Sequence, residues 1–235
     1  MNILIVDEHI VFREILESLC SNLLGDVAVT CVADGASAIR LCQSQMFSLL
    51  LLDLQLPDID SFDIADAAAA LKPDIPILAL SSHCNEYNVF RAEKRRVRGF
   101  VDKRVATISV LHEAITRVAA NSPYFSPSFL RLKSERIRDT MSFDKILSER
   151  ELEVLALVAA PFSNQEIAAE LGISPQTVEK HRFNILRKLG LHTTAQLVRF
   201  GRRRGIVRCP EQLAASPAHP PVRPTRPAAC RLPIN

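Results

Sequence analysis

The sequence has no apolar run long enough to cross a membrane. A spanning helix needs about 18 or more consecutive apolar residues, but Asp53 interrupts the longest leucine stretch and Asp66 interrupts the alanine-rich one. A leader peptide is also not expected, because the short apolar run Ile3-Leu4-Ile5-Val6 has no basic segment before it and acidic residues directly after it. We therefore expect a cytoplasmic protein with no membrane partner.

The six cysteines are scattered and include no Cys-x-x-Cys pair. This spacing argues against a zinc site or a disulfide framework and is typical of reduced cytosolic thiols. Proline is unevenly distributed, since seven of the fourteen prolines fall within residues 209–235. Because proline at that density prevents helix and sheet hydrogen bonding, we expect residues 209–235 to form a disordered tail.

The small net charge of +3 conceals two halves of opposite sign. Residues 1–120 hold 11 basic and 16 acidic side chains, a balance of −5, whereas residues 121–235 hold 18 basic and 10 acidic side chains, a balance of +8. An acidic front and a basic back indicate two units with different partners, one of which can be a polyanion such as nucleic acid. The length of 235 residues also favours one medium and one small domain.

Short continuous apolar runs alternate with helix-length segments in the front half. Strands buried on both faces of a parallel sheet have this pattern, and parallel strands need crossovers of about a dozen residues. The pattern predicts an α/β domain with a five-stranded parallel sheet over residues 1–120. The expected strands are 3–6, 27–29, 49–52, 75–80 and 99–101, and the expected helices are 9–24, 35–46, 60–71, 84–95 and 107–120.

Polar side chains follow these strands at the points where they end. Asp7 and Glu8 follow the first strand, Asp53 the third, Ser81 the fourth and Lys103 the fifth. The carboxyl ends of parallel strands meet at the edge where open sheets bind ligands. Each polar residue alone could be a helix cap, but three carboxylates at one edge are hard oxygen ligands suited to Mg²⁺.

Four segments of this half resemble the receiver domain of two-component response regulators. They are Ile-Leu-Ile-Val-Asp-Glu-His at 3–9, Leu-Leu-Leu-Asp-Leu-Gln-Leu-Pro-Asp at 50–58, Ala-Leu-Ser-Ser at 79–82 and Gly-Phe-Val-Asp-Lys at 99–103. The resemblance extends to about residue 120. It implies a flavodoxin-like fold with strand order 2-1-3-4-5.

The resemblance also implies roles for the polar residues. Asp53 would accept a phosphoryl group from a sensor histidine kinase, and Ser81 and Lys103 would contact that group. The implied ligands of Mg²⁺ or Mn²⁺ are Asp7 (through water), Glu8, Asp53 and the backbone carbonyl of Gln55. These residue types suit phosphoryl transfer, which depends on positioning and on neutralising charge.

A phosphatase of the haloacid dehalogenase type is the competing enzyme interpretation. Such enzymes also use an aspartate after a strand, but they need a second aspartate two residues later as the general acid. Gln55 stands at that position and cannot donate and recover a proton. We therefore expect no turnover enzyme, only a domain that catalyses its own phosphoryl uptake and loss.

Two features before Lys103 leave alternatives open. By resemblance Phe100 would be an aromatic switch residue, although an ordinary core aromatic is an equal explanation. The segment 91–98 carries five basic residues where relatives usually have alanine and glycine near positions 95 and 96. It is either a solvated helix face or an altered partner surface. The basic residues are Arg91, Lys94, Arg95, Arg96 and Arg98.

A linker and a small helical domain are predicted beyond the receiver. Residues 121–145 contain a proline-punctuated bend and one short basic helix, and residues 146–208 contain four helices, at about 148–160, 164–171, 175–189 and 194–204. Ser148 with Glu151 and Ser163 with Glu166 match the capping box, and Ser174 precedes a proline at a helix start. Pro161 follows the first of these helices, and proline cannot take the left-handed conformation that glycine takes at a helix end, so that turn must close differently.

The second and third of these helices form a helix-turn-helix, in which the later helix enters the major groove. Leu147-Ser148-Glu149-Arg150-Glu151, Ser163-Asn164-Gln165-Glu166-Ile167-Ala168 and Ile173-Ser174-Pro175-Gln176-Thr177-Val178-Glu179-Lys180-His181-Arg182 resemble the LuxR/NarL-type DNA-binding domain. By matching position, Glu179, Lys180 and Phe183 would face base edges. Ser163, Asn164, Gln165, Thr177 and Arg182 would contact phosphates. His181 is expected to pack or to bond backbone.

Together these patterns predict a transcription factor controlled by phosphorylation of Asp53. Phosphorylation would release a reading helix covered by the receiver, or would promote a homodimer that places two domains on paired half-sites of promoter DNA. One alternative is a phosphorylation-independent regulator whose receiver is a protein-interaction module. Another is a ligand-sensing quorum regulator, which would need an apolar pocket domain in front.

Overall fold

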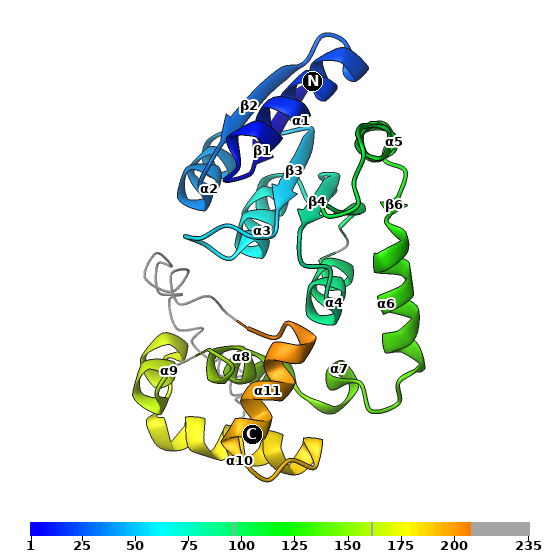
Figure 1. Cartoon of the computed structure of the whole chain (residues 1–235). Helices are drawn as coiled ribbons and strands as arrows, with labels where there is room; N and C mark the ends of the chain where they lie inside the picture. The colour runs from blue at the N-terminus through cyan, green and yellow to red at the C-terminus, as the bar shows by residue number, and fades with distance from the viewer. Residues whose placement is uncertain (96, 161, 208–235) are drawn as a thin grey trace, which may run out of the picture.

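The computed structural model describes residues 1–95, 97–160 and 162–207 as two domains joined by a linker helix (Figure 1). The predicted disordered tail, Arg96 and Pro161 lie outside the described residues. No helix among the described residues is both long and apolar enough to cross a membrane.

The first domain is built on a parallel sheet of order β2-β1-β3-β4-β5-β6, which confirms the predicted order of the first five strands. The sixth strand corrects the predicted number of five. It comes from the predicted linker, where two aromatic residues pair with the free edge of β5. The strands are β1 (Asn2–Val6), β2 (Ala28–Val32), β3 (Leu49–Asp53), β4 (Ile77–Ser81), β5 (Gly99–Asp102) and β6 (Tyr124–Phe125).

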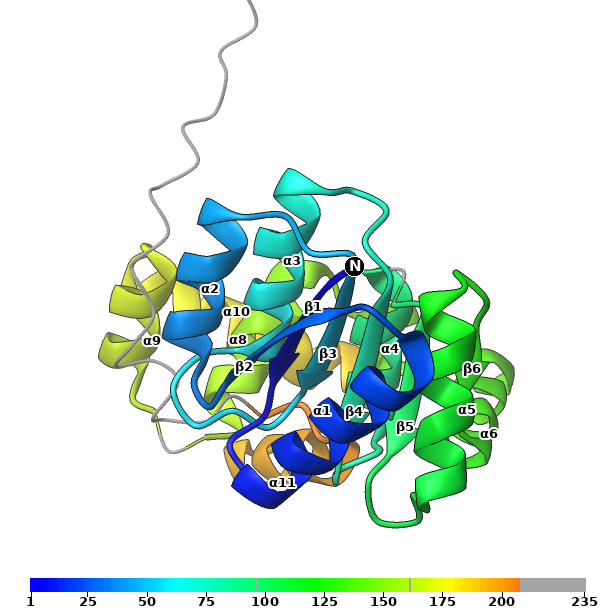
Figure 2. The ribbon, with the colours of Figure 1, turned by 90° about the horizontal axis from the view of Figure 1, so that it is seen from above.

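Helices cover both faces of this sheet (Figure 2). α1 and α5 pack on one face, where the core contains Ile3, Ile5, Leu49 and Leu51. α2, α3 and α4 pack on the other face, because successive strand residues point to opposite sides and both sides are apolar here. These helices are α1 (Ile10–Leu24), α2 (Gly35–Ser44), α3 (Ser61–Leu71), α4 (Glu86–Lys94) and α5 (Ile108–Ala119).

The linker contains α6 (Pro127–Arg138), at the place of the expected basic helix. Tyr124 and Phe125 lead into it by pairing with Gly99 and Phe100 of β5. Beyond this strand the linker leaves the sheet, and α6 runs along one side of the molecule from the first domain to the second (Figure 1).

The second domain has the four expected helices and one that was not predicted. The additional α7 (Phe143–Ile146) is a single turn whose Phe143 is fully buried in the domain core. Both expected capping boxes are present, Ser148 with Glu151 and Ser163 with Glu166, and Ser174 caps the helix that begins at Pro175. The four expected helices are α8 (Glu149–Val158), α9 (Asn164–Leu171), α10 (Pro175–Leu189) and α11 (Thr194–Arg204).

Candidate phosphoryl-acceptor site and nucleic-acid interface

The sheet brings Asp7, Asp53 and Lys103 together although they are far apart in the sequence. Asp53 is the last residue of β3, Asp7 follows β1, and both carboxylates are buried. The Lys103 ammonium lies between them, with Nζ 2.5 Å from Asp7 Oδ2 and 2.7 Å from Asp53 Oδ2. The predicted convergence of strand-end residues is therefore present for these three side chains.

The electrostatics of this cluster favour a cation in addition to Lys103. Burial raises the pKa of the Asp53 carboxyl, the Lys103 ammonium opposes that rise, and the neighbouring Asp7 carboxylate adds to it. Two buried carboxylates share one ammonium, so negative charge remains in excess. Carboxylate oxygens are hard ligands, and the donor set fits Mg²⁺.

The potential metal ligands differ in part from the expected set. Asp7, His9 and Asp53 offer ligand atoms within 4.8 Å of one another, whereas Glu8 is not in that group. The exposed His9 donates its backbone N–H to Asp7 Oδ1 at 3.0 Å, with Nδ1 3.3 Å from the same oxygen. Imidazole suits Zn²⁺, Cu²⁺, iron and Ni²⁺ better than Mg²⁺. The expected ligand set did not include His9, because its position two residues after Asp7 was the sole sign in the sequence that it lies at this edge of the sheet.

Ser81 and Gln55 tie together the loops that follow β3 and β4. Ser81 is buried, and its hydroxyl accepts a hydrogen bond from the His83 backbone N–H at 3.0 Å. Gln55 donates its N–H to Asp53 Oδ1 at 3.0 Å and accepts from Ser82 N–H through Oε1 at 2.9 Å. The Gln55 amide also contacts the His83 ring. These bonds hold the loop after β3 and the loop after β4 in place next to Asp53.

The reading helix α10 presents its predicted base-contacting residues to solvent. Val178 and Ile185 on one face are buried in the domain core, whereas Glu179 and Lys180 are exposed and Phe183 is 63% exposed. α10 also lies at the end of the molecule away from the first domain (Figure 1). The expectation that the receiver covers the reading helix is therefore wrong for this arrangement.

Comparisons with known proteins match each of the two domains to a family. Residues 3–116 match the family model of the response regulator receiver domain, and residues 145–200 match that of the luxR family of bacterial regulatory proteins. The oxygen regulatory protein NreC of Staphylococcus carnosus is 31% identical over 210 residues, which cover 85% of this chain and 96% of NreC. The chain belongs to the luxR-family response regulators.

Further relatives match this chain over both domains. The response regulator protein VraR of Staphylococcus saprophyticus is 30% identical over 198 residues, which cover 84% of this chain and 94% of VraR. A solved structure of RcsB from Salmonella enterica serovar Typhimurium, bound to promoter rprA with the phosphomimetic BeF3⁻, shares the fold. The TM-score is 0.59 at 23% identity, with 85% of this chain and 98% of RcsB covered. This protein is thus a DNA-binding response regulator of a two-component system.

In this response regulator Phe100 is fully buried and packs against the linker. Its ring centroid lies 5.0 Å from that of Phe129 of α6, which stacks on Phe125 at 4.6 Å. The side chain is therefore a core aromatic in this structure. Its role as a switch residue remains a prediction.

Two arginines of the basic segment 91–98 connect α4 to α3 and are not a solvated helix face. Arg91 Nη2 lies 2.6 Å from Asp60 Oδ2, and its guanidinium stands 4.2 Å from the centre of the Phe62 ring. Arg95 Nη2 lies 3.0 Å from Asp66 Oδ2. These two basic side chains therefore hold the fourth helix against the third.

Several predicted phosphate contacts also have structural partners in the luxR-family domain. Asn164 Oδ1 accepts a hydrogen bond from Arg182 Nη1 at 2.6 Å, and Arg182 Nη2 donates to Thr194 Oγ1 at 3.2 Å. Arg182 thereby joins α9, α10 and the start of α11. A guanidinium has five N–H donors, so this role and a phosphate contact are compatible.

Ser163 and Thr177 are likewise engaged at helix starts, whereas Gln165 is exposed. The Ser163 hydroxyl donates to Glu166 Oε2 at 2.7 Å, and Thr177 Oγ1 lies 2.8 Å from Ser174 Oγ. The contacts of all these residues with DNA remain predictions.

Proposed function

We propose that Asp53 is the phosphoryl acceptor of this response regulator and that a sensor histidine kinase is the donor. The observation that supports this is the buried pair of carboxylates, Asp7 and Asp53, bridged by Lys103. A buried carboxylate beside an ammonium and a potential metal ligand set is the environment that phosphoryl transfer needs.

In the proposed reaction an Asp53 oxygen attacks the phosphorus of the phosphohistidine. The new bond joins carboxylate oxygen to phosphorus, the phosphorus–nitrogen bond breaks, and the kinase histidine leaves. Lys103 holds the carboxylate and offsets charge on the phosphoryl oxygens, and Gln55 N–H orients the other carboxylate oxygen. Bound Mg²⁺ or Mn²⁺, held by Asp7 and Asp53 with Glu8, His9 or the Gln55 carbonyl, would neutralise further charge.

The output that we propose is regulation of promoter DNA by a homodimer in the cytoplasm. The exposed reading helix supplies the DNA contact, and the exposed apolar side chains Val11 and Ile108 on α1 and α5 supply a surface suited to a second copy. A solved RcsB structure, TM-score 0.55, is described as two RcsB dimers bound to two parallel DNAs. Beyond its own phosphoryl uptake and loss, we propose no catalytic turnover.

The test is phosphoryl incorporation from radiolabelled acetyl phosphate with Mg²⁺. Asp53→Asn should abolish acid-labile incorporation, because an amide cannot attack the phosphorus. Asp102→Asn is the matched control, since Asp102 is also a buried aspartate at a strand end but pairs with Arg104. Unchanged incorporation by Asp53→Asn would place the acceptor elsewhere. No incorporation by the unaltered protein would favour the phosphorylation-independent regulator.

A further inference from the structure

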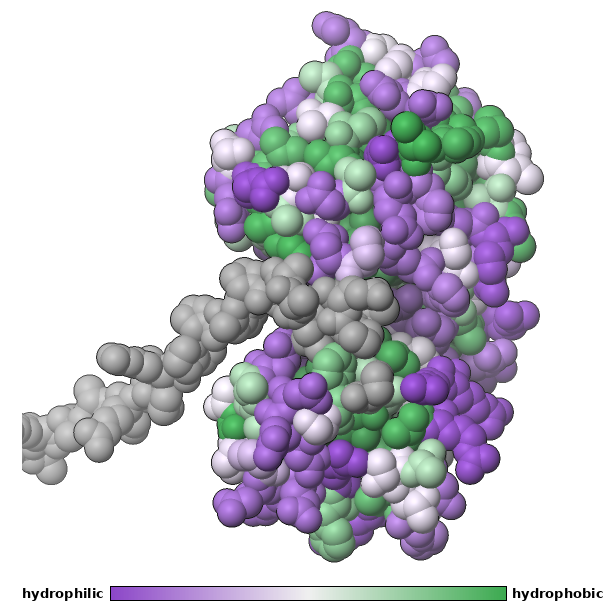
Figure 3. Space-filling view, turned by 60° about the vertical axis from the view of Figure 1, so that its left-hand side comes forward, coloured by the Kyte–Doolittle hydropathy of each residue, from purple (hydrophilic) through white to green (hydrophobic). Residues whose placement is uncertain are grey.

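The exposed face of α10 carries two side chains that do not suit contact with phosphates. Val178 and Ile185 turn another face of the helix into the core of the second domain, whereas Glu179 and Phe183, four residues apart, are exposed. Hydrophilic residues cover much of the visible surface of this domain (Figure 3). Phe183, at 63% exposure, is the one aromatic side chain that the described part of the chain leaves largely in solvent. Attraction to phosphates explains neither the carboxylate nor the ring.

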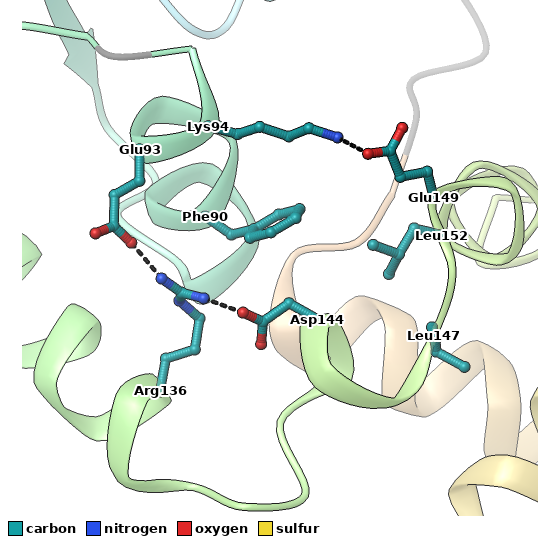
Figure 4. Close-up of a pocket in the computed structure, with 8 residues that line it drawn as sticks. All are labelled: Phe90, Glu93, Lys94, Arg136, Asp144, Leu147, Glu149 and Leu152. Carbon is teal, nitrogen blue, oxygen red and sulfur yellow. Dashed lines mark hydrogen bonds and ion pairs between the residues drawn. The ribbon is translucent and has the colours of Figure 1, made fainter.

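The contacts between the two domains leave this face of α10 free. The receiver helix α4 meets the second domain at α7 and α8, where Lys94 pairs with Glu149 (Figure 4). The Phe143 ring of α7 also packs edge-on against Tyr87 and Phe90 of α4, at 6.2 and 5.6 Å between ring centroids. The N-terminal part of α10, which reaches base edges when such a helix enters the major groove, therefore stays accessible.

Glu179 has no cationic partner within the described part of the chain. Arg182, the basic residue three positions further along α10, donates instead to Asn164 Oδ1 at 2.6 Å and to Thr194 Oγ1 at 3.2 Å. Close to DNA an unpaired carboxylate is repelled by the phosphates, and this cost is offset only where the carboxylate accepts a hydrogen bond from a base. Glu179 therefore disfavours every sequence that lacks a donor at its position.

Cytosine is the base whose major-groove edge suits this carboxylate. Cytosine presents its N4 amino group as a donor, whereas guanine presents two acceptors, N7 and O6. Thymine presents the acceptor O4, and adenine presents the N6 donor beside the N7 acceptor. A carboxylate at adenine would thus meet one favourable and one repulsive group. Hydrogen-bond complementarity therefore ranks cytosine above the other three bases at the Glu179 position.

Phe183 lies about one helical turn after Glu179 on the same face and suits an apolar base edge. The C5-methyl group of thymine is the apolar group of the major groove, and a phenylalanine ring can contact it. Four residues of an α-helix span about 6 Å, and successive bases of one strand are about 3.4 Å apart. The two side chains therefore reach bases that are about one to two positions apart.

We propose that Glu179 specifies a cytosine, and Phe183 a thymine about one to two base pairs away, in the stretch of major groove that one α10 covers. Glu179 acts mainly by rejecting other bases, because its carboxylate gains nothing from the phosphates. Phe183 acts by burying its exposed ring against the methyl group. This inference rests on the DNA contact proposed for α10 and not on phosphorylation of Asp53.

Selection from a randomised DNA duplex library with the full-length protein tests the cytosine assignment. The unaltered protein should enrich cytosine at one fixed position, and exchange of that base pair for T·A should weaken binding about ten-fold. Glu179→Gln should enrich adenine there instead, because an amide can donate to N7 and accept from N6. Glu153→Gln is the control, since it removes the same charge from a half-exposed side chain of α8. It should select the same sites as the unaltered protein.

Deoxyuridine in place of the selected thymine tests Phe183, because deoxyuridine lacks only the C5-methyl group. In fluorescence anisotropy the unaltered protein should bind the uracil duplex about three- to five-fold more weakly than the thymine duplex. Phe183→Ser should bind the two duplexes equally, since its short side chain does not reach the methyl group. Circular dichroism should show that this variant stays folded, as expected when an exposed side chain is replaced.

Three outcomes would overturn these base assignments: selected sites without a fixed cytosine, an unchanged cytosine with Glu179→Gln, or equal discrimination against uracil by Phe183→Ser and the unaltered protein. If the unaltered protein enriches no sequence, with or without acetyl phosphate and Mg²⁺, the DNA contact proposed for α10 fails as well. Enrichment of a different base at the Glu179 position leaves that contact intact and overturns the cytosine assignment alone.

Discussion

At the scale of single residues, the phosphoryl-acceptor site depends on one ammonium between two buried carboxylates. Lys103 is nearly buried, so its charge is poorly screened by water. Breaking a buried ion pair is strongly destabilising because it leaves uncompensated charge. Without Lys103, this cluster would contain two buried carboxylates and no ammonium to neutralise them.

Replacing Lys103 with methionine should therefore destabilise the receiver in the absence of metal. We expect a loss of about 3 to 5 kcal/mol at neutral pH, measured by urea denaturation. The loss should shrink as the pH falls, because the pKa of Asp53 is already raised by burial and protonation removes the repulsion.

Metal addition separates this electrostatic effect from lost packing. Mg²⁺ should stabilise Lys103→Met more than the unaltered protein, since the ion replaces the missing positive charge. Lys72→Met, outside this edge, is the control. An Mg²⁺ response no larger than that of the unaltered protein would argue against a metal site formed by Asp7 and Asp53.

The strand-end residues were predictable from sequence because sheet topology determines where they lie. The convergence of Asp7, Asp53 and Lys103 follows from the five apolar runs, because the carboxyl ends of parallel strands meet at one edge of the sheet. The His9 contact and the bonds of Gln55 to Ser82 and His83 depend on loop conformations and rotamers. No periodicity in the sequence encodes those.

At the scale of elements, the helices of the DNA-binding domain begin where their caps indicate. Ser148 and Ser163 each form the reciprocal bonds of a capping box. A capping box involves residues only three positions apart, so these helix starts were predictable from the local sequence. α7 and β6 were not, because Phe143 packs against Phe90 and Phe125 pairs with Phe100, and both partners are distant in the sequence.

Glu151 should make the stability of this domain depend on pH. Burial is the largest influence and raises its pKa, but the bonds from Lys188 and Ser148 together outweigh burial and lower the pKa of the carboxyl. Its stabilising contribution is therefore present above the ordinary glutamate pKa of about 4.3 and is lost as the pH falls through the lowered value.

Glu151→Gln should cost about 1 to 2 kcal/mol at neutral pH, measured as the free energy of unfolding of the domain. The difference from the unaltered protein should vanish in acid. Glu153→Gln on the same helix should change little, because that side chain is half exposed in its pair with Arg150. Equal losses for both variants would contradict the account of Glu151.

At the scale of the whole molecule, the two domains share an aromatic contact. The sequence has an acidic front and a basic back, and the two family models match one domain each. The contact itself was not predictable. Tyr87 and Phe90 occur in a helix whose sequence gives no sign that a second domain covers them.

Phe90→Ala in the receiver should therefore loosen the DNA-binding domain. We expect faster hydrogen exchange in α7 and α8, corresponding to a loss of about 1 to 3 kcal/mol for a partly buried aromatic. Ile108→Ala is the control, because Ile108 is 57% exposed on α5. Faster exchange confined to the receiver would show that the two cores are energetically independent.

The sixth strand determines where the chain can be divided. An unpaired strand edge is a template for aggregation, and β6 covers the edge of β5 while Phe129 covers Phe100. A fragment that ends near residue 120 would expose both the edge and the aromatic ring. A fragment that continues through α6 keeps them covered, so we expect a fragment that ends after residue 138 to aggregate less than one that ends near residue 120.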